Sequence, residues 1–212
     1  MDAWTKTNPG SAVILAGGLS RRLGRDKAAV TIDGQTLLAR MVALGSRFCP
    51  QTAVSGRDPA PFLPPGNPIP WFADLVPDAG PLGGIVTALA TLQTSCLILS
   101  CDLPHMDQAT IATLIDAWRI RPAAAVMTTY QQTDTGYIEA LVAIYEPSAL
   151  PLLRQAHGQG VFSLSKAIPP ALRHHIPYDT GDPSQARPFY NLNTPADLAE
   201  LGQQGRLNDF SN

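Results

Sequence analysis

The sequence predicts an α/β fold: a single three-layer αβα domain in which helices cover both faces of a mostly parallel, Rossmann-like sheet. Two observations lead to this class. Several short runs are apolar and rich in β-branched residues throughout, which is typical of strands buried on both faces of a parallel sheet. Up to about residue 120, these runs alternate with longer segments whose apolar residues recur at helical spacing. Such alternation predicts parallel strands joined by helical crossovers.

Each expected strand is a short apolar run that stops at a glycine or a polar residue. The first run reads SAVILAG, and the clearest one reads CLILSCD and ends on Asp102. After residue 120 two further runs, AAAVMTTY and EALVAIY, continue the pattern. We therefore expect strands at residues 11–17, 52–56, 96–102, 123–130 and 139–145.

The expected helices combine helical spacing of apolar residues with recognisable N-caps. Asp107 or Thr110 would cap the third helix, and Thr194 would cap the last one. The proline-dense stretch at residues 58–70 is expected to be an irregular loop, too short to link two domains. We expect helices at residues 36–49, 80–93, 106–118, 148–157, 162–168 and 195–205.

The composition indicates a soluble globular protein without a general affinity for polyanions. Apolar residues make up 45% of the chain, charged residues 15%, and the formal net charge is −2. This charge argues against nucleic acid or an anionic membrane as a partner. The opening stretch, MDAWTKTNPGS, lacks the apolar run of a signal peptide, and no later run is long enough to span a membrane. We expect a flexible N-terminal segment at residues 1–11 and one domain at residues 12–212.

The cysteines indicate the cellular compartment of the protein. Cys49, Cys96 and Cys101 are odd in number, widely spaced and flanked by apolar residues. We interpret them as buried, reduced thiols of a cytoplasmic protein, with a metal or redox role as the alternative.

The stretch ILAGGLSRRLGRDKA, at residues 14–28, places glycines, three arginines and a lysine directly after the first expected strand. Ligands of open parallel sheets bind beyond the carboxyl ends of the strands. Glycines let backbone N–H groups approach an anion closely and cations neutralise its charge, so a triphosphate fits this stretch. The P-loop is excluded because Arg25 rather than lysine follows Gly24. The dinucleotide-binding fingerprint G-x-G-x-x-G is also excluded, because the glycines of this stretch do not have its spacing.

The same stretch resembles L-A-G-G-x-S-x-R-[ML]-G-x-D-K, the signature of nucleotidyltransferases of the molybdenum cofactor guanylyltransferase family. The matching residues are Leu15, Ala16, Gly17, Gly18, Ser20, Arg22, Leu23, Gly24, Asp26 and Lys27. Further resemblances follow in order: DAGPLGGI at 78–85, SCDLPHM at 100–106 and NLNTPADL at 191–198. The first motif alone would also suit sugar-phosphate and polyol-phosphate nucleotidyltransferases, whereas the last two favour the molybdenum cofactor branch.

The resemblance implies a fold like that of nucleotide-diphospho-sugar transferases, and it implies transfer of GMP from GTP to molybdenum-molybdopterin. The products would be molybdopterin guanine dinucleotide and pyrophosphate. GTP would bind the half at residues 12–120 and molybdopterin the half at residues 121–204. A cytidylyltransferase acting on molybdopterin, or on a sugar or polyol phosphate, is the alternative. Retention of both Lys27 and Asp102 argues against a regulatory domain without turnover. Family grounds also suggest transient contact with molybdenum cofactor biosynthesis proteins or molybdoenzymes.

The resemblance implies three catalytic residues: Lys27, Asp102 and Arg22. Asp102 would bind Mg²⁺, with Mn²⁺ as the alternative metal, because an oxygen-preferring cation that bridges phosphates suits a carboxylate at a strand end. A helix N-cap is the competing role for Asp102. Lys27 and Arg22 would neutralise phosphate charge, whereas Arg21 and Arg25 either assist or form a solvated salt bridge with Asp26.

The nucleotide contacts implied by the resemblance are Leu15, Ala16, Gly17, Gly18, Ser20, Lys27, Ser55, Asp74 and Asp102. The backbone at residues 15–17 would meet the guanine and ribose. Asp74 could accept from the N1–H and amino donors of guanine, and Asp78 is the competing candidate.

On the acceptor side, Asn191 and Asn193 resemble residues that line the pterin, with turn and capping chemistry as their alternative role. Relatives often carry a His-Pro pair where this chain has Ile138 and Glu139, so the family's pterin contacts in that region are not carried over to these two residues. His105 could approach the site. The remaining histidines, His157, His174 and His175, are expected to face the solvent.

Overall fold

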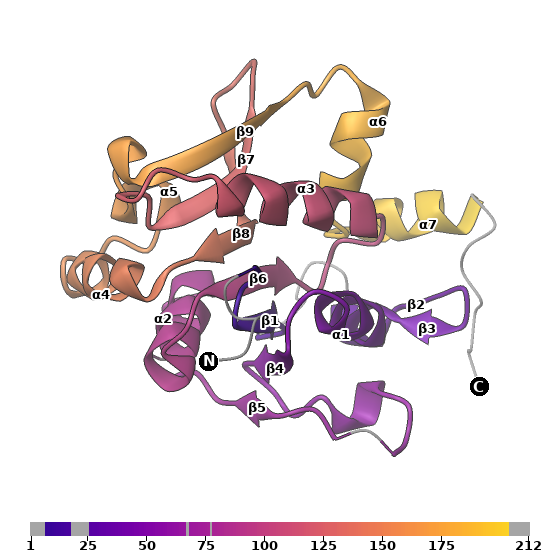
Figure 1. The fold of residues 1–212 in the computed structure, drawn as a ribbon. Coiled ribbons are helices and arrows are strands. Elements are labelled where there is room, and N and C mark those ends of the chain that lie inside the picture. Colours follow the sequence, from indigo (N-terminus) through magenta and orange to yellow (C-terminus); the bar gives the residue numbers. More distant parts are fainter. Residues whose placement is uncertain (1–6, 18–25, 67, 77, 204–212) are drawn as a thin grey trace.

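The computed structural model describes residues 7–17, 26–66, 68–76 and 78–203. A seven-stranded sheet lies at the centre, with helices on both of its faces (Figure 1), which confirms the predicted three-layer α/β domain. The strand order across the sheet is β5 (Trp71–Phe72), β4 (Gln51–Ser55), β1 (Ser11–Leu15), β6 (Cys96–Ser100), β8 (Ile138–Tyr145), β7 (Met127–Gln132) and β9 (Arg173–Tyr178).

The strands pair in parallel except at β8, which runs antiparallel to both of its neighbours, β6 and β7. The sheet is therefore mostly parallel, as predicted. Leu15, the last residue of β1, is in register with Ser55 of β4 and Ser100 of β6. The carboxyl ends of these strands consequently lie side by side, and so do the residues that follow them.

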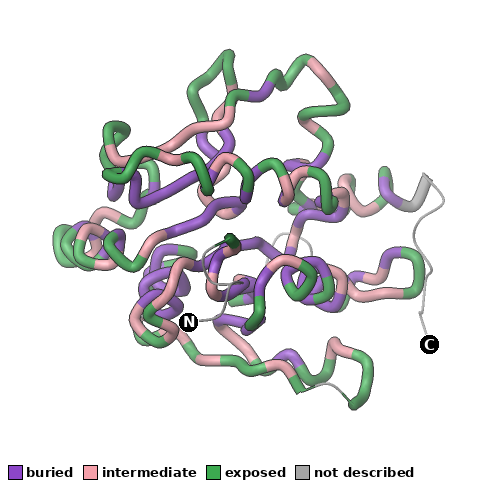
Figure 2. The backbone as a smooth tube through the Cα atoms, in the orientation of Figure 1, coloured by how far each residue is buried: buried purple, intermediate pink, exposed green. Residues whose placement is uncertain are grey.

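The helices form two layers because alternate residues of each strand face opposite sides of the sheet. Ile14 packs with α1 (Leu37–Ser46) and α3 (Gln108–Arg119), whereas Val13 packs on the opposite side. That side is covered by α2 (Pro81–Leu92), α4 (Leu150–Gly158) and α5 (Leu164–Ala167). Figure 2 shows many buried residues along the central strands and in the helices that pack on them.

A third apolar cluster joins the C-terminal part of the chain to the residues after Lys27. The hairpin β2 (Thr31–Ile32) and β3 (Gln35–Thr36) precedes α1, and α7 (Pro195–Gln203) packs beside it. The buried members of the cluster are Val30, Ile32, Leu37, Leu192 and Leu201. The remaining short helices are η2 (Lys27–Ala29), η3 (Ala60–Phe62), η4 (Pro147–Ala149), η5 (Pro170–Leu172), α6 (Pro183–Ala186) and η6 (Arg187–Phe189).

The predicted helices are present, and their caps agree with the sequence. The Asp107 carboxylate accepts from Thr110 N at 2.8 Å, so Asp107 is the N-cap of α3. At the start of α7, Asp197 N donates to Thr194 Oγ1 at 3.3 Å and Thr194 N donates to Asp197 Oδ2 at 2.8 Å. These reciprocal bonds form a capping box.

The expectation that the three other histidines face the solvent is wrong. His174 and His175 lie half-buried on β9, a strand that the sequence reasoning missed. His157 is also half-buried, and its ring packs edge-on against Phe162 with 5.8 Å between centroids.

The cysteines are buried and free, which confirms their interpretation as buried thiols. Burial raises the pKa of Cys49, Cys96 and Cys101 to about 12, so each thiol stays protonated and unreactive at neutral pH.

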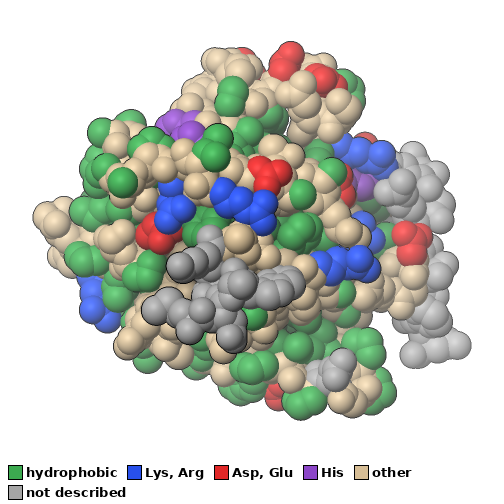
Figure 3. Space-filling model, viewed as in Figure 1, with side chains coloured by type: hydrophobic (Ala, Val, Ile, Leu, Met, Phe, Trp, Pro, Cys, Tyr) green, Lys and Arg blue, Asp and Glu red, His purple; other side chains and the backbone are tan. Residues whose placement is uncertain are grey.

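Among the described residues, no helix has the length and apolar character needed to cross a membrane. On the face shown in Figure 3, the Lys and Arg side chains of the described residues are scattered among acidic and polar ones.

Candidate active site at the carboxyl ends of the central strands

The loops that follow β1, β4 and β6 meet at one end of the sheet, where open parallel sheets bind their ligands. Ala16 N donates to Ser55 O at 3.0 Å, and Cys101 N donates to Leu15 O at 3.3 Å. The predicted site residues Leu15, Ala16, Gly17, Ser55 and Asp102 are thereby brought to the same end. Gly18, Ser20, Arg21, Arg22 and Arg25 lie outside the described residues.

Lys27 connects predicted residues that are far apart in the sequence. Its Nζ lies 2.9 Å from Asp102 Oδ2 and 2.6 Å from Asn193 Oδ1. The Lys27 and Asp102 side chains are only 18% and 16% exposed, so water screens this ion pair less than it screens a surface pair. The pair is therefore a partly buried charged centre at the end of the central strand.

Several contacts hold this centre in place. Ser100 Oγ donates to Asp102 Oδ1 at 2.5 Å, and Leu192 N donates to Asp102 O at 2.8 Å. Asp26 Oδ1 accepts from Ala28 N at 3.0 Å and so caps the short helix η2 that begins with Lys27. Asp102 is thus part of a charged network rather than the N-cap of α3, a role that Asp107 takes.

A second carboxylate, that of Asp74, follows β5 and so lies on the opposite side of β1 from β6 and Asp102. Ser55 Oγ donates to Asp74 Oδ1 at 2.8 Å, with Ser55 buried and Asp74 half-buried. A Cβ atom added at Gly84, near the start of α2, would lie 3.6 Å from Asp74 Oδ1, and one added at Gly17 would lie 3.5 Å from Asp74 Oδ2. Asp74 therefore lies between Gly17 and α2, whereas the competing Asp78 is exposed in the turn that precedes this helix.

The loops after β1 and β4 touch through glycine. Gly56 has φ +101°, and a Cβ atom added there would lie 2.4 Å from Gly17 Cα. Any side chain at Gly56 would push the two loops apart, so close backbone approach is built into the site.

Arg57 is a contact that the sequence reasoning missed. Its Nη1 donates to Asp26 Oδ2, and its guanidinium lies 5.7 Å from the centroid of the Phe62 ring. Arg57 thereby links the residue before Lys27 to the proline-rich stretch. Its position directly after Gly56, the glycine that follows β4, is the signal that could have indicated it.

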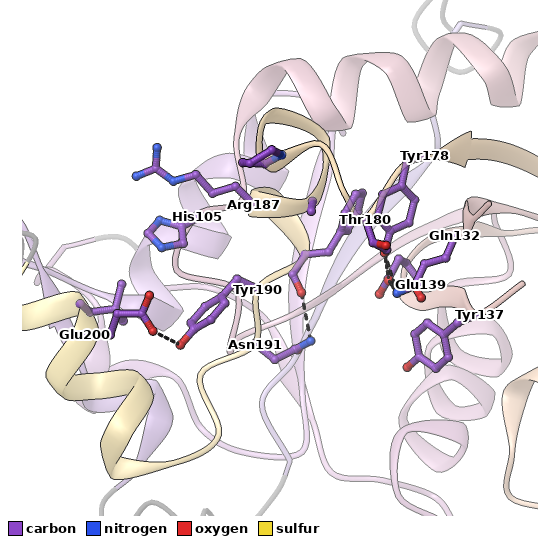
Figure 4. A pocket seen from close by; sticks show the side chains of 14 residues that line it. His105, Gln132, Tyr137, Glu139, Tyr178, Thr180, Arg187, Tyr190, Asn191 and Glu200 are labelled. Atoms are coloured by element: carbon purple, nitrogen blue, oxygen red, sulfur yellow. Dashed lines mark hydrogen bonds between the residues drawn. The ribbon is translucent and has the colours of Figure 1, made fainter. Parts of the chain in front are cut away.

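The segments that carry Asp102 and Asn193 also contribute residues to a cavity of about 650 Å³ (Figure 4). Asn191 and His105 line it, and Asn191 Nδ2 donates to Phe189 O at 3.1 Å. The two predicted acceptor residues thus differ in place: Asn191 faces the cavity, whereas Asn193 contacts Lys27. The cavity is also lined by residues that were not predicted as site residues from the sequence, including Gln132, Tyr137, Glu139, Tyr178 and Tyr190.

The fold and the site together define a class: an α/β protein that binds a nucleotide at the strand ends of a doubly covered sheet. The family profile of the MobA-like NTP transferase domain matches residues 12–174, and the chain belongs to this family. The protein is therefore a nucleotidyltransferase by family.

Similar proteins agree with this assignment. A relative from Chloroflexus aggregans, named a probable molybdenum cofactor guanylyltransferase, is 35% identical over 89% of this chain and 91% of its own length. The crystal structure of molybdopterin-guanine dinucleotide biosynthesis protein A from Archaeoglobus fulgidus has a TM-score of 0.73 and 25% identity, covering 92% and 98% of the two chains. Rv0371c from Mycobacterium tuberculosis, solved as a manganese complex, has a TM-score of 0.57 at 18% identity over 92% and 98%, a likeness of fold alone.

Proposed function

We propose that the protein transfers GMP from GTP to molybdenum-molybdopterin, forming molybdopterin guanine dinucleotide and pyrophosphate. The observation that carries the proposal is the partly buried ion pair of Lys27 with Asp102, joined by the contact of Lys27 with Asn193, in a chain with relatives named guanylyltransferases. The terminal phosphate oxygen of molybdopterin attacks the α-phosphorus of GTP. The bond from the α-phosphorus to the bridging oxygen breaks, and pyrophosphate leaves.

The residues of the chain act by positioning and by charge. Lys27, together with Arg22, neutralises the triphosphate and the charge that develops on its oxygens. The backbone of the β1 loop, including Gly18 and Ser20, holds the nucleotide against the sheet, which aligns the α-phosphorus with the acceptor. Asp74, held by Ser55, accepts from the N1–H and amino groups of guanine.

Asp102 is the residue proposed to hold a divalent cation, Mg²⁺ or alternatively Mn²⁺. Among the described residues, no group of three or more His, Cys, Asp or Glu side chains could hold a metal. One carboxylate nevertheless fits Mg²⁺, which commonly takes one or two carboxylates together with phosphate oxygens and water. When bound, the cation supplies charge neutralisation at the phosphates.

The proposal also assigns the two substrates to different parts of the chain. Residues 12–120 bind the nucleotide and residues 121–204 the acceptor, within one domain at 12–212 that follows the N-terminal segment 1–11. The buried free thiols favour a cytoplasmic location. There the protein would make transient contact with molybdenum cofactor biosynthesis proteins or molybdoenzymes.

The test is incubation of the protein with molybdopterin, Mg²⁺ and each of the four nucleoside triphosphates, followed by detection of the dinucleotide. We expect product with GTP, and none with the Asp102→Asn variant. A product formed from CTP instead would establish the cytidylyltransferase alternative, which has less support because several relatives carry guanylyltransferase names. No product with any nucleotide would contradict the proposal.

A further inference from the structure

The cavity beside the charged centre has the lining of a site for a flat heterocycle. Its walls carry the rings of Tyr137, Tyr178, Phe189 and Tyr190, and Figure 4 shows Glu139 and Tyr178 meeting at one side. Aromatic walls with a few polar groups are typical of pockets that bind planar ligands. The polar groups of the lining determine which hydrogen-bond donors and acceptors the ligand must carry.

Glu139 is an unusual member of this lining because its carboxylate is half-buried and forms no ion pair with any described residue. Its Oε1 accepts from the Tyr178 hydroxyl at 2.5 Å and from Gln132 Nε2 at 3.4 Å. Gln132 Nε2 also donates to the Tyr178 hydroxyl at 2.9 Å, which closes the network. Within the described part of the chain, no hydrogen bond to the other oxygen, Oε2, is seen. Oε2 is not among the fully buried polar atoms of the described residues that lack a partner, so it remains accessible to a donor on a ligand in the cavity.

Tyr178 is well placed to hold Glu139 in one orientation. Its ring packs against Phe189 with 4.5 Å between centroids and meets Tyr130 edge-on at 6.3 Å. Burial of this ring fixes the hydroxyl, and the hydroxyl fixes one oxygen of the carboxylate. The second oxygen is then presented in a constant direction.

The nucleotide side of the molecule contains a similar pair. There, Ser55 Oγ donates to one oxygen of Asp74, just as the Tyr178 hydroxyl donates to one oxygen of Glu139. Guanine and pterin carry the same edge, a ring N–H beside an exocyclic amino group. A carboxylate accepts from both donors of such an edge. Two carboxylates held in the same way therefore suit the two halves of the proposed reaction.

We propose that Glu139 determines specificity for the acceptor by accepting hydrogen bonds from the 2-amino and N3–H groups of its pterin, with Tyr178 as its positioning residue. Choosing pterin as the ligand rests on the proposed function. The segment after Phe189 supports the placement, because Asn191 lines the cavity while Asn193 contacts Lys27. A ligand in the cavity thus lies next to the charged centre.

The test compares two soluble probes, pterin and lumazine, by calorimetric titration. Lumazine is a pteridine of the same shape in which a carbonyl replaces the amino group, so it offers Glu139 an acceptor instead of a donor. The wild-type protein should bind pterin at least about tenfold more tightly than lumazine, because a site built for a donor rejects an analogue that lacks it. Glu139→Gln, which is isosteric and presents both a donor and an acceptor, should abolish this preference.

Two further variants separate specificity from folding. Tyr178→Phe keeps the ring and should reduce the preference severalfold while the melting temperature shows that the protein remains folded. Glu146→Gln is the matched control: this half-buried carboxylate, at the other end of β8, contacts Trp118 and Arg121. It should leave the preference intact. Equal wild-type affinity for the two probes, or an unchanged preference in Glu139→Gln, would overturn the inference.

The same experiments separate this inference from the proposed function. A pterin preference that depends on Glu139, in a protein that forms no dinucleotide, would support the site and refute the transferase activity. Dinucleotide formation with the same KM for molybdopterin in wild type and Glu139→Gln would refute the role of Glu139 and leave the activity standing.

Discussion

The Lys27 ammonium contacts both Asp102 and Asn193, and removing it takes away the cation that pairs with the Asp102 carboxylate. We predict that Lys27→Met lowers kcat/KM for GTP roughly 10- to 100-fold, the effect of losing one or two charged hydrogen bonds. The loss should be largest at low ionic strength, because salt screens the interaction. Steady-state assays across a salt series measure both effects. Lys166→Met, at an exposed position of α5, is the matched control, and equal activity of the two variants would contradict the prediction.

Burial raises the pKa of Glu139 above its ordinary value of 4.5, although its hydrogen bonds to Tyr178 and Gln132 oppose the shift. A carboxyl group with a raised pKa favours the folded state most when it is protonated, below 4.5, and this contribution is lost as the pH rises through the folded-state pKa. Glutamine does not ionise. We therefore predict that Glu139→Gln melts at a higher temperature than wild type at neutral pH.

The melting-temperature difference should shrink as the pH falls toward 4.5, the ordinary pKa of this side chain. Scanning fluorimetry over a pH series measures it. Glu146→Gln should instead lower the melting temperature at neutral pH, because it removes the charge partner of Arg121 at 2.9 Å. A difference for Glu139→Gln that does not vary with pH would refute the prediction.

Site residues could be predicted from the sequence where they lie in a continuous motif. Lys27, Asp102 and Asn193 each belong to a separate motif, and the structure brings them into contact. The pairing of Glu139 with Tyr178 could not be predicted, because it depends on which strands are neighbours across β8, β7 and β9. No local pattern in the sequence encodes that order.

The close approach of the β1 and β4 loops gives a prediction about these elements. Gly56 and Gly66 have nearly the same φ, +101° and +102°, but only at Gly56 would a Cβ atom meet backbone, 2.4 Å from Gly17 Cα. Both alanine variants pay the strain of a positive φ. Gly56→Ala should cost about 1–3 kcal/mol more in free energy of unfolding, because the loops must separate.

Gly56→Ala should also weaken GTP binding, since Gly17 moves with its loop, whereas Gly66→Ala should not. Urea unfolding and calorimetric titration with GTP measure the two effects. If the two variants matched in both, the contact between the loops would have no role in nucleotide binding.

The elements themselves were predictable where one face or both faces are strongly apolar. Helices α1, α2 and α3 and strands β1 and β6 follow from spacing alone, because tertiary packing and local pattern agree there. Strand β9 was missed because its sequence, RHHIPY, contains a proline and two histidines, and it is an edge strand that pairs only with β7. The reversed direction of β8 was also not predictable, since a buried antiparallel strand has the same apolar run as a parallel one.

On the scale of the whole molecule, the site draws on almost the full length of the chain. Lys27 and Asn193 are 166 positions apart, yet their side chains touch, and the apolar cluster of Val30, Leu37 and Leu192 holds their segments together. A ligand bound between such distant segments stabilises the entire domain, because unfolding of either segment destroys the site. Nucleotide binding should therefore be visible in global stability.

We predict that GTP with Mg²⁺ raises the melting temperature more than CTP, ATP or UTP does. At 100 times its Kd, a ligand adds about 2.7 kcal/mol to the free energy of unfolding. For a chain of this size, that corresponds to a shift of roughly 5–10 °C. Chelation of the metal should remove part of the GTP shift in wild type and none in Asp102→Asn, because the variant lacks the proposed metal ligand. Equal shifts with all four nucleotides would refute guanine selection, whereas equal sensitivity of both proteins to the chelator would separate Asp102 from the metal.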